Sequence, residues 1–550
     1  MKRYLKTWMP FVAVALSIVY LSGCKKELNQ VPQTTITDSN FWHTTNDMAI
    51  ADNYLYSYLP GLNYLTSTYL VPAFQEMYAT TAFGQGPNIV SDDAWTTPTT
   101  SPEYTNYYKL IRAANNVLEK SVTVTGDQAT INRYLAEARF FRAFGYFELV
   151  KRFGDVPLIL RTLNLTDSLL QAPRTNRTLV IKQIYNDLDY AAANLPQPDQ
   201  LASAEYGRIT ATAALAFKSR VALFEGTREK FFNYGNSAAD LQIAIDASNA
   251  VISGGKHSVF NYAANPDSSY HYLFQMQGEG PANREHILAH IYGQSDANNI
   301  QSHSFSSAEN NRIIVGTRSL VDAYLYQDGL PIGKSSFYQP VQTSTLTETQ
   351  NRDPRFGMTI FNKNQYYISA NYVPSASYNL KKWFIANTLV NYSYLDFDII
   401  RYAEVLLNNA EAKFELKGSV SDGDLNSTIN LLRSRVKMPA LTNSFVGANG
   451  LDMRTEIRRE RRIELAFEGF EYWDLLRWKT AETELPKAIL GPKYFQAEMP
   501  LVTNPVLDAN GYIVLEAASK RGFNIQRGYL WPLPTNEIAL NPHLTQNPGW

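Results

Sequence analysis

The chain has 550 residues, and its 50 Lys and Arg against 51 Asp and Glu give a formal net charge of -1. This balance excludes a strongly basic nucleic-acid-binding chain, which would carry an excess or a stripe of positive charge. Aromatic residues make up 13% of the chain and include 35 tyrosines, which suit binding surfaces but are also consumed by large cores.

The N-terminus has the pattern of a lipoprotein leader. Three positive charges among the first six residues precede an apolar run over about 8–20, which is too short to span a bilayer comfortably. Leu21-Ser22-Gly23-Cys24 then resembles a bacterial lipobox, and Cys24 is the one cysteine of the chain. We expect residues 1–23 to be a signal peptide and Cys24 to carry acyl chains that anchor the protein to a membrane. A plain signal peptide with an incidental cysteine, or an uncleaved anchor, are the alternatives.

The residues after the lipobox divide into a tether and one long domain. Residues 24–40 are polar and are predicted to form a lipidated tether, and 41–550 to form a single domain. Within this domain, several segments carry apolar residues at helical spacing. The helices predicted from this spacing cover about 104–120, 131–152, 180–194, 209–225, 239–253, 401–416, 425–436 and 453–478.

A small residue stands four positions before a phenylalanine within four of these helices. This spacing lets two helices approach closely and is part of the tetratricopeptide-repeat pattern, although Ala and Phe are common in any packed helix. The copies are spaced irregularly, which favours helix pairs with long insertions over a regular solenoid. The four pairs are Ala143/Phe147, Ala213/Phe217, Ala410/Phe414 and Ala466/Phe470.

Two stretches, about 66–102 and 257–395, have a different composition. They are rich in Tyr, Ser, Asn, Gly and Pro and show weak periodicity. Loops this long are usually functional or disordered, and their aromatic content argues against disorder. A helical scaffold with aromatic-rich loop insertions is a sensible way to build a binding surface.

Motifs of catalysis are largely missing from the sequence. There is no His-Glu-x-x-His and no Gly-x-Ser-x-Gly, and the phosphate-loop-like residues 329–335 have three residues between their glycines where the motif needs four. We therefore expect no catalytic residues, no metal site and no cofactor. Asp92 and Asp93 stand beside Trp95, and two carboxylates suffice for a glycosidase, so a hydrolase stays open beside the interpretation as a polar rim or a cation site.

The predicted helix at 453–478 has the densest charge pattern of the chain. Glutamates recur every four residues and form one stripe, and arginines form another about opposite. Like charges at this spacing repel by a few tenths of a kcal/mol, which is tolerable if neighbouring segments supply counter-charges. We interpret the pattern as an ion-pair network rather than an acidic or basic site, with Arg459 and Arg461 also reaching Glu456 and Glu464. The stripes are Glu456, Glu460, Glu464 and Glu468, and Arg454, Arg458 and Arg462, while Ile463, Phe467 and Phe470 are predicted to face the core.

A set of motifs in fixed order resembles the SusD/RagB family of outer-membrane lipoproteins from Bacteroidota. The matches run from the lipobox to the last residue and are specific together, though not singly. They are Leu28 with Pro32, Asn40-Phe41-Trp42, AEARFFRA at 136–143, FGDVPL at 153–158, DPR at 353–355, RYAEVLL at 401–407, ERRIELAFEG at 460–469, WDLLRW at 473–478, WPLP at 531–534 and QNPGW at 546–550.

The resemblance implies a mostly α, SusD-like fold with tetratricopeptide-like helix pairs as its scaffold. It implies attachment to the outer membrane, facing the cell exterior, and pairing with a SusC-like TonB-dependent barrel. It also implies a binding protein that is not an enzyme and has no nucleic-acid partner. Ligands of the family are mostly glycans, while some relatives handle peptides, so capture of a peptide or other nutrient stays open, as does a lipid-anchored glycoside hydrolase.

Family motifs are largely scaffold residues, so ligand contacts are sought in the insertions. Sugar rings have apolar faces that match flat aromatic rings, and polar neighbours satisfy the hydroxyls. In SusD-like proteins the part of the chain that corresponds to 78–95 is near the glycan site. The alternative is that these aromatics fold inward as satellite cores, and Trp531 and Trp550 are interpreted as structural. The candidate ligand-binding residues are Tyr78, Asn88, Asp92, Asp93, Trp95, Tyr372 and Trp383.

Overall fold

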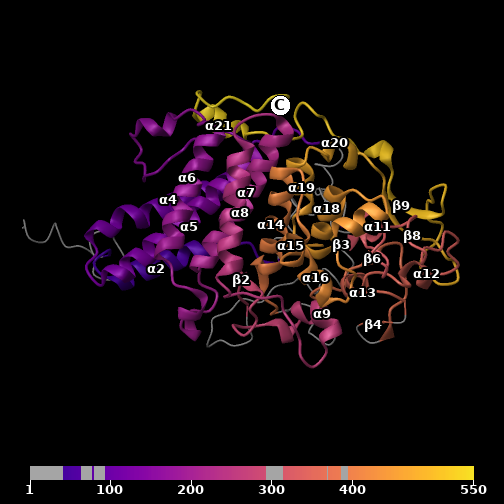
Figure 1. Ribbon diagram of the computed structural model, residues 1–550. Coiled ribbons are helices and arrows are strands. Elements are labelled where there is room, and N and C mark those ends of the chain that lie inside the picture. The colour runs from indigo at the N-terminus through magenta and orange to yellow at the C-terminus, as the bar shows by residue number, and fades with distance from the viewer. Residues whose placement is uncertain are drawn as a thin grey trace, which may run out of the picture.

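The computed structural model describes residues 41–62, 77–79, 93–292, 314–363, 365–367, 370–385 and 394–550. The predicted signal peptide, Cys24 and the tether at 24–40 lie outside these residues, as do Asn88 and Asp92. Over the described part of the chain, helices dominate and strands are few and short (Figure 1), which confirms the mostly α fold class. None of the helices in these residues is long and apolar enough to cross a membrane.

The first half of the chain is a set of long helices laid side by side. Figure 1 shows them following one another across the molecule in chain order, and the predicted helices up to residue 253 are all present. Polar caps set their starts: Ser101 accepts the Tyr104 N–H before α4, and Thr210 accepts the Ala213 N–H before α7. These helices are α2 (Thr45–Tyr56), α4 (Pro102–Lys120), α5 (Gln128–Phe153), α6 (Arg177–Asn194), α7 (Ala211–Phe232) and α8 (Ser237–Ser253).

The second half places further helices against the first and adds short strands at one end of the molecule. Helix α14 packs on α7, α8 and α18, and β8, β9 and α12 form the end opposite α2 and α4 (Figure 1). The helices are α9 (Ser269–Leu273), α11 (Arg318–Ala323), α12 (Thr345–Thr349), α13 (Pro354–Thr359), α14 (Tyr402–Lys417), α15 (Asp422–Asn426), α16 (Ile429–Arg435), α17 (Asn443–Ala448), α18 (Met453–Glu464), α19 (Glu471–Arg477), α20 (Ala481–Glu484) and α21 (Thr535–Leu540). The strands are β1 (Met77–Ala79), β2 (His286–His290), β3 (Ile314–Gly316), β4 (Tyr366–Tyr367), β5 (Ala370–Asn371), β6 (Tyr378–Asn379), β7 (Phe397–Arg401), β8 (Ile489–Lys493) and β9 (Tyr512–Glu516).

One hydrophobic core extends from Trp42 near the start of the described chain to Leu544 near its end. Aromatic rings on α5 and α7 lie at its centre, where Phe144 and Phe147 contact Phe217 at ring-centroid distances of 5.5 and 5.6 Å. The Ala143/Phe147 and Ala213/Phe217 pairs both belong to this contact. The description of the helix pairs as tetratricopeptide-like, and the division of the chain into leader, tether and one domain, stay predictions.

The structure corrects two of the predicted helices. The segment 453–478 is broken between α18 and α19, where Phe467 and Gly469 have φ of 66° and 84°. Ala466 and Phe470 therefore lie outside a helix. The segment 425–436 is also broken, because the Ser427 and Thr428 hydroxyls bond back to the Asp424 carbonyl in competition with the helix.

A buried ion-pair network around α18 matches the interpretation of its glutamate stripe. Arg355 bonds Glu460 and Glu464 at 2.6 and 2.9 Å, and Arg401 bonds Glu464 and Glu468 at 2.7 and 2.8 Å. Counter-charges thus come from other segments of the chain. Arg459 pairs with Glu456 as predicted, whereas Arg461 pairs with Asp474 on α19 in place of Glu464.

Candidate ligand-binding site

A small sheet brings the two predicted insertions together. Strand β1, from the first insertion, pairs antiparallel with β3, and β3 pairs with β6, both from the second insertion. In the register, Tyr78 lies opposite Val315, and Val315 opposite Asn379. Segments that are almost 300 residues apart in the sequence therefore form one sheet, in which Val315, Tyr378 and Asn379 are buried.

Three described segments that end next to undescribed parts of the chain also lie close together. Residues 62, 292 and 394 border three parts of the insertions that lie outside the described residues. A Cβ on Gly61 would lie 2.1 Å from the Tyr292 hydroxyl, and the Tyr292 N–H donates to Asp396 Oδ1 at 2.7 Å. We call the described segments that end at these three residues the stems, and we call Gly61, His290, Tyr292 and Asp396, which lie where the stems meet, the stem junction.

A groove opens beside the stem junction, between the end of α2, the connection from α6 to α7, and β2. It consists of two adjoining cavities of about 290 and 230 Å³. Each alone is smaller than the roughly 300 Å³ usual for a ligand pocket, but together they enter that range. Both cavities are lined by Tyr206, Gly207, Arg208, Ala289 and Ile291.

Flat rings and a close backbone approach shape the groove. The His290 imidazole stacks on the Tyr292 ring, with centroids 4.7 Å apart and planes 19° apart, and the Tyr206 ring lines both cavities. Gly207 has φ of 92°, and a Cβ there would lie 2.5 Å from Ile291, so a side chain at this position would close the passage between the connection and β2.

The charged groups beneath the groove are compensated by one another. Arg208 donates to Glu137 at 2.7 Å, to Asp52 at 3.1 Å and to the side-chain oxygen of Asn53 at 2.6 Å. Burial alone would lower the pKa of Arg208, but Glu137 beside it raises the pKa above its ordinary value, whereas burial and Glu137 raise the pKa of Asp52. The donors of Arg208 are thus engaged within the protein.

One residue of the stem junction, Asp396, forms a carboxyl pair with Glu279. The Asp396 N–H donates to both carboxylate oxygens of Glu279 at 3.2 Å, while Asp396 Oδ1 accepts a hydrogen bond from the Tyr292 N–H. Burial and the neighbouring Asp396 raise the pKa of Glu279 to about 10, and burial also raises the pKa of Asp396. At neutral pH the pair therefore carries a proton that its ordinary carboxyl pKa values would not retain.

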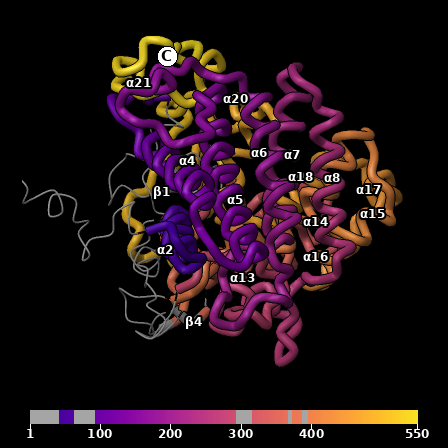
Figure 2. Tube along the Cα trace, turned by 90° about the vertical axis from the view of Figure 1, so that its left-hand side faces the viewer, coloured from indigo at the N-terminus to yellow at the C-terminus, as the bar shows by residue number. Residues whose placement is uncertain are grey.

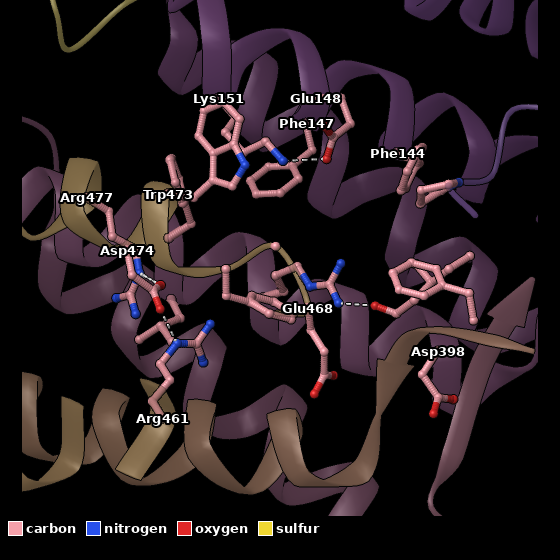
Figure 3. A pocket seen from close by; sticks show the side chains of 18 residues that line it. Phe144, Phe147, Glu148, Lys151, Asp398, Arg461, Glu468, Trp473, Asp474 and Arg477 are labelled. Atoms are coloured by element: carbon pink, nitrogen blue, oxygen red, sulfur yellow. Dashed lines mark hydrogen bonds and ion pairs between the residues drawn. The ribbon is translucent and has the colours of Figure 1, made fainter. Parts of the chain in front are cut away.

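Apart from the groove, a separate cavity lies inside the molecule between α5, α7 and α19, and Figure 3 shows the charged side chains that line it. Its volume is about 80 Å³, enough for two or three waters of about 30 Å³ but too small for an oligosaccharide. Lys151 bonds Glu148 at 2.7 Å, and burial lowers the pKa of Lys151 to about 7. Arg461 and Asp474, which also line the cavity, bond each other at 2.7 Å. We interpret this cavity as part of the polar core.

Two of the predicted ligand-binding residues are buried in packing contacts. Tyr372 and Trp383 are 5% and 2% exposed. Tyr372 stacks on Phe361 in a small cluster with Phe384, and Trp383 lies against Phe274. This packing matches the inward-folded alternative that was weighed for the loop aromatics, and a ligand role for Tyr372 and Trp383 stays an untested prediction.

The residues of the first insertion are placed differently. Trp95 is half-buried, and its ring meets Trp531 edge-on at 4.7 Å, while Asp93 accepts a hydrogen bond from Arg527 at 2.8 Å. Both residues lie near the C-terminus of the chain, where the ring centroids of Trp95 and Trp550 are 6.0 Å apart. Tyr78 lies in β1 of the small sheet. A ligand role for these residues, and for Asn88 and Asp92, stays a prediction.

The groove and the stem junction were not found from the sequence. Tyr206, His290 and Gly61 stand in no motif, and only their positions close to the ends of the predicted helices and insertions set them apart. A signal was available in principle, because an insertion must leave and rejoin the scaffold somewhere. Which of these points converge depends on the helix packing.

Two family models match the chain. One, described as the SusD family, matches residues 284–550, and the other, described as starch-binding associating with outer membrane, matches residues 30–223. A SusD-like protein of Formosa agariphila is 26% identical, and the match covers 100% of each chain.

Solved structures show the same fold. A SusD-like carbohydrate-binding protein of Bacteroides fragilis is 24% identical, with a TM-score of 0.74 over 92% of this chain and 100% of that one. A second SusD-like protein of Bacteroides fragilis is 25% identical, with a TM-score of 0.72 over 95% of this chain and 100% of its own.

Proposed function

The chain belongs to the SusD family, and on this premise we propose that it binds an oligosaccharide or polysaccharide at the cell surface and passes it to a SusC-like TonB-dependent barrel. In this proposal the protein is anchored in the outer membrane through Cys24 and faces the cell exterior. One of the similar solved structures, from Bacteroides fragilis, is named as a carbohydrate-binding protein, which supports a carbohydrate as the ligand.

The observation that carries the proposal is that three described segments bordering the insertions meet beside the groove. Gly61, Tyr292 and Asp396 join the three stems, and His290 and Ile291, next to Tyr292 in the chain, line the groove. A ligand in the groove would therefore sit near residues 62, 292 and 394, which border three parts of the aromatic-rich insertions. Loops on a rigid scaffold are the usual place for binding residues.

The groove chemistry supports a glycan. The faces of Tyr206 and His290 match the apolar faces of sugar rings, and Asn53 offers an exposed polar side chain at the rim. Because Glu137 and Asp52 compensate the charge of Arg208, this arginine does not by itself favour an anionic ligand. A peptide would also find apolar and polar groups here, so the ligand class is decided by experiment.

The first prediction concerns Tyr206. Soluble protein that starts at Lys25 is run through native gels containing a panel of polysaccharides, and one or more should retard it. Tyr206→Ala should weaken this binding about tenfold, because a lost aromatic contact is worth up to about 1.5 kcal/mol. Tyr206→Phe should retain it.

Tyr54→Ala is the matched control, since Tyr54 is 56% exposed and does not line the groove. Equal binding by wild type and Tyr206→Ala would contradict the assigned site. Retardation by no glycan in the panel would turn the proposal toward a peptide or other nutrient, and sugar released from the gel matrix would point to a hydrolase.

A further inference from the structure

The cavity of about 230 Å³ is the part of the groove with most ionisable side chains. Helices α6, α7 and α8 run side by side (Figure 2), so the connection from α6 to α7 and the end of α8 lie at the same end of these helices. The His257 imidazole, four residues after α8, bonds the Thr212 hydroxyl in the first turn of α7 at 2.8 Å. The ionisable side chains that line this cavity are Asp199, Arg208, Lys256, His257, Arg284 and His286.

Two of the cations in this cavity are paired with carboxylates. Arg208 bonds Glu137 and Asp52 beneath the groove. Lys256 bonds Asp199 at 2.5 Å, and Asp199 is the one carboxylate among the described residues that line the cavity. These two cations therefore add no net positive charge to the groove.

The two histidines of the cavity are neutral at neutral pH. Burial, together with the charge of the nearby Arg284, lowers the pKa of His257 to about 4. Burial also lowers the pKa of His286, although Asp396 acts to raise it. Neither imidazole therefore supplies a positive charge to the cavity.

Arg284 differs from these groups because its charge has no carboxylate partner within the described residues. The side chain is exposed, and its guanidinium donates from Nε to the Lys256 carbonyl at 3.0 Å and from Nη2 to the Gly255 carbonyl. These two carbonyls follow α8 and fix the position of the guanidinium, while Nη1 has no hydrogen bond to the part of the chain that the structure describes. A guanidinium held in this way loses little freedom when it binds an anion, and its planar fork matches a carboxylate or a sulfate.

The remaining walls of the cavity suit a sugar ring. They include the Tyr206 ring and the apolar side chains of Leu201, Ile287, Leu288, Ala289 and Ile291. A free inorganic anion at Arg284 would leave these walls without a contact. A sugar ring with a charged substituent would place its C–H faces on the apolar walls and its substituent on the guanidinium.

We infer that the groove takes an acidic glycan, whose carboxylate or sulfate ester binds Arg284 while its ring lies against Tyr206. This inference deepens the proposed function and rests on it. It assigns specificity for the charged substituent to Arg284 and leaves the binding of the ring to the aromatic and apolar walls.

The test compares acidic polysaccharides with their neutral counterparts. Polygalacturonic acid and alginate are paired with their carboxyl-reduced forms, and a sulfated galactan with its desulfated form. The soluble chain that starts at Lys25 is run through native gels containing each polymer. We expect it to bind at least one acidic polymer about tenfold more tightly than the neutral counterpart, because hydrogen bonds to charged groups are the stronger ones. The carboxylate and sulfate pairs show which substituent is bound.

Arg284→Gln should remove this preference. Its binding of the acidic polymer should be about tenfold weaker than that of wild type, while its binding of the neutral counterpart is unchanged, which also shows that the variant is folded. Arg112→Gln is the matched control, since it makes the same change of net charge. Arg112 is also exposed and donates to a backbone carbonyl, that of Leu163, at 2.9 Å, but it does not line the groove.

The outcomes separate this inference from the proposed function. If wild type binds the acidic and neutral forms equally, or if Arg284→Gln and Arg112→Gln lose the same amount of binding, the inference is overturned and the proposed function stands. If poly-glutamate retards the chain and no polysaccharide does, the ligand is an acidic peptide, and both are overturned.

Discussion

Buried arginines hold the helical scaffold together through carboxylates from distant segments. Arg401 at the end of β7 bonds Glu285, Glu464 and Glu468 at 2.7 to 2.8 Å, and its side chain is 1% exposed. Burial acts to raise the pKa of Glu464, but Arg435, Arg401 and Arg355 hold it below its ordinary range. Removing one partner from such a network leaves uncompensated buried charge.

The second prediction follows from this network. Arg401→Met should lower the free energy of unfolding by about 3–5 kcal/mol, measured by denaturant titration. Lys437→Ala is the control, because Lys437 and its partner Asp267 are 72% and 63% exposed and the pair contributes about 0–1 kcal/mol. If Arg401→Met lowers the free energy of unfolding by less than about 1 kcal/mol, the network contributes little to the stability of the fold.

The third prediction concerns pH and the carboxyl pair at the stem junction. Glu279 has an ordinary pKa of 4.5, which rises to about 10 in the folded protein. Between these values the folded state binds more protons than the unfolded state, so this group makes the free energy of unfolding fall as pH rises. The side chain introduced by Glu279→Gln has no proton to lose. The free energy of unfolding of this variant, relative to that of wild type, should therefore be higher at pH 9 than at pH 5.

Denaturant titrations of both proteins at the two pH values measure this difference directly. Comparing variant with wild type removes the contributions of other buried groups, such as Lys151, whose lowered pKa acts in the opposite direction. A stability difference that is independent of pH would contradict the assignment of the shared proton to Glu279 and Asp396.

At the scale of elements, the sequence predicted the helices but not where two of them break. Apolar spacing indicated α4 to α8 and α14 because each packs a continuous face into the core. It gave no sign of the break after Glu464. There, Arg401 and Tyr270 bond the Glu464 carbonyl and Lys382 bonds the Ala466 carbonyl, so groups from elsewhere take the partners that a continuing helix would supply.

The fourth prediction concerns the close approach of two stems at Gly61. Gly61→Ala should lower the free energy of unfolding by about 1–3 kcal/mol and weaken glycan binding, because its Cβ would collide with the Tyr292 hydroxyl. Tyr292→Phe in the same chain should restore both properties in large part, since the next nearest atom is 3.3 Å away.

Gly447→Ala is the control for this pair of variants. Gly447 lies in α17, and a Cβ there meets nothing within 4 Å, so the substitution should be neutral or slightly stabilising. If Gly61→Ala is tolerated as well as Gly447→Ala, or if Tyr292→Phe restores nothing, the stems do not meet as described.

For the whole molecule, the ordered family motifs predicted the fold because they are scaffold residues. Residues such as Arg355, Arg401 and Trp531 are buried and hold helices together, so their identity and order report the packing. The ligand site had no such signal. Tyr372 and Trp383 had the composition of a binding loop yet pack inward, while Tyr206 and His290 line a groove that exists only because α2, the connection before α7, and β2 meet.

The most direct test of the account is to map the ligand on the protein. Hydroxyl-radical footprinting of the soluble chain, with and without the glycan that retards it, reports the exposure of individual side chains by mass spectrometry. The account predicts that glycan protects Tyr206 and His290 while Tyr54 remains as reactive as before. Protection confined to Trp95 and Trp550, with Tyr206 and His290 unchanged, would contradict the assignment of the binding site to the groove.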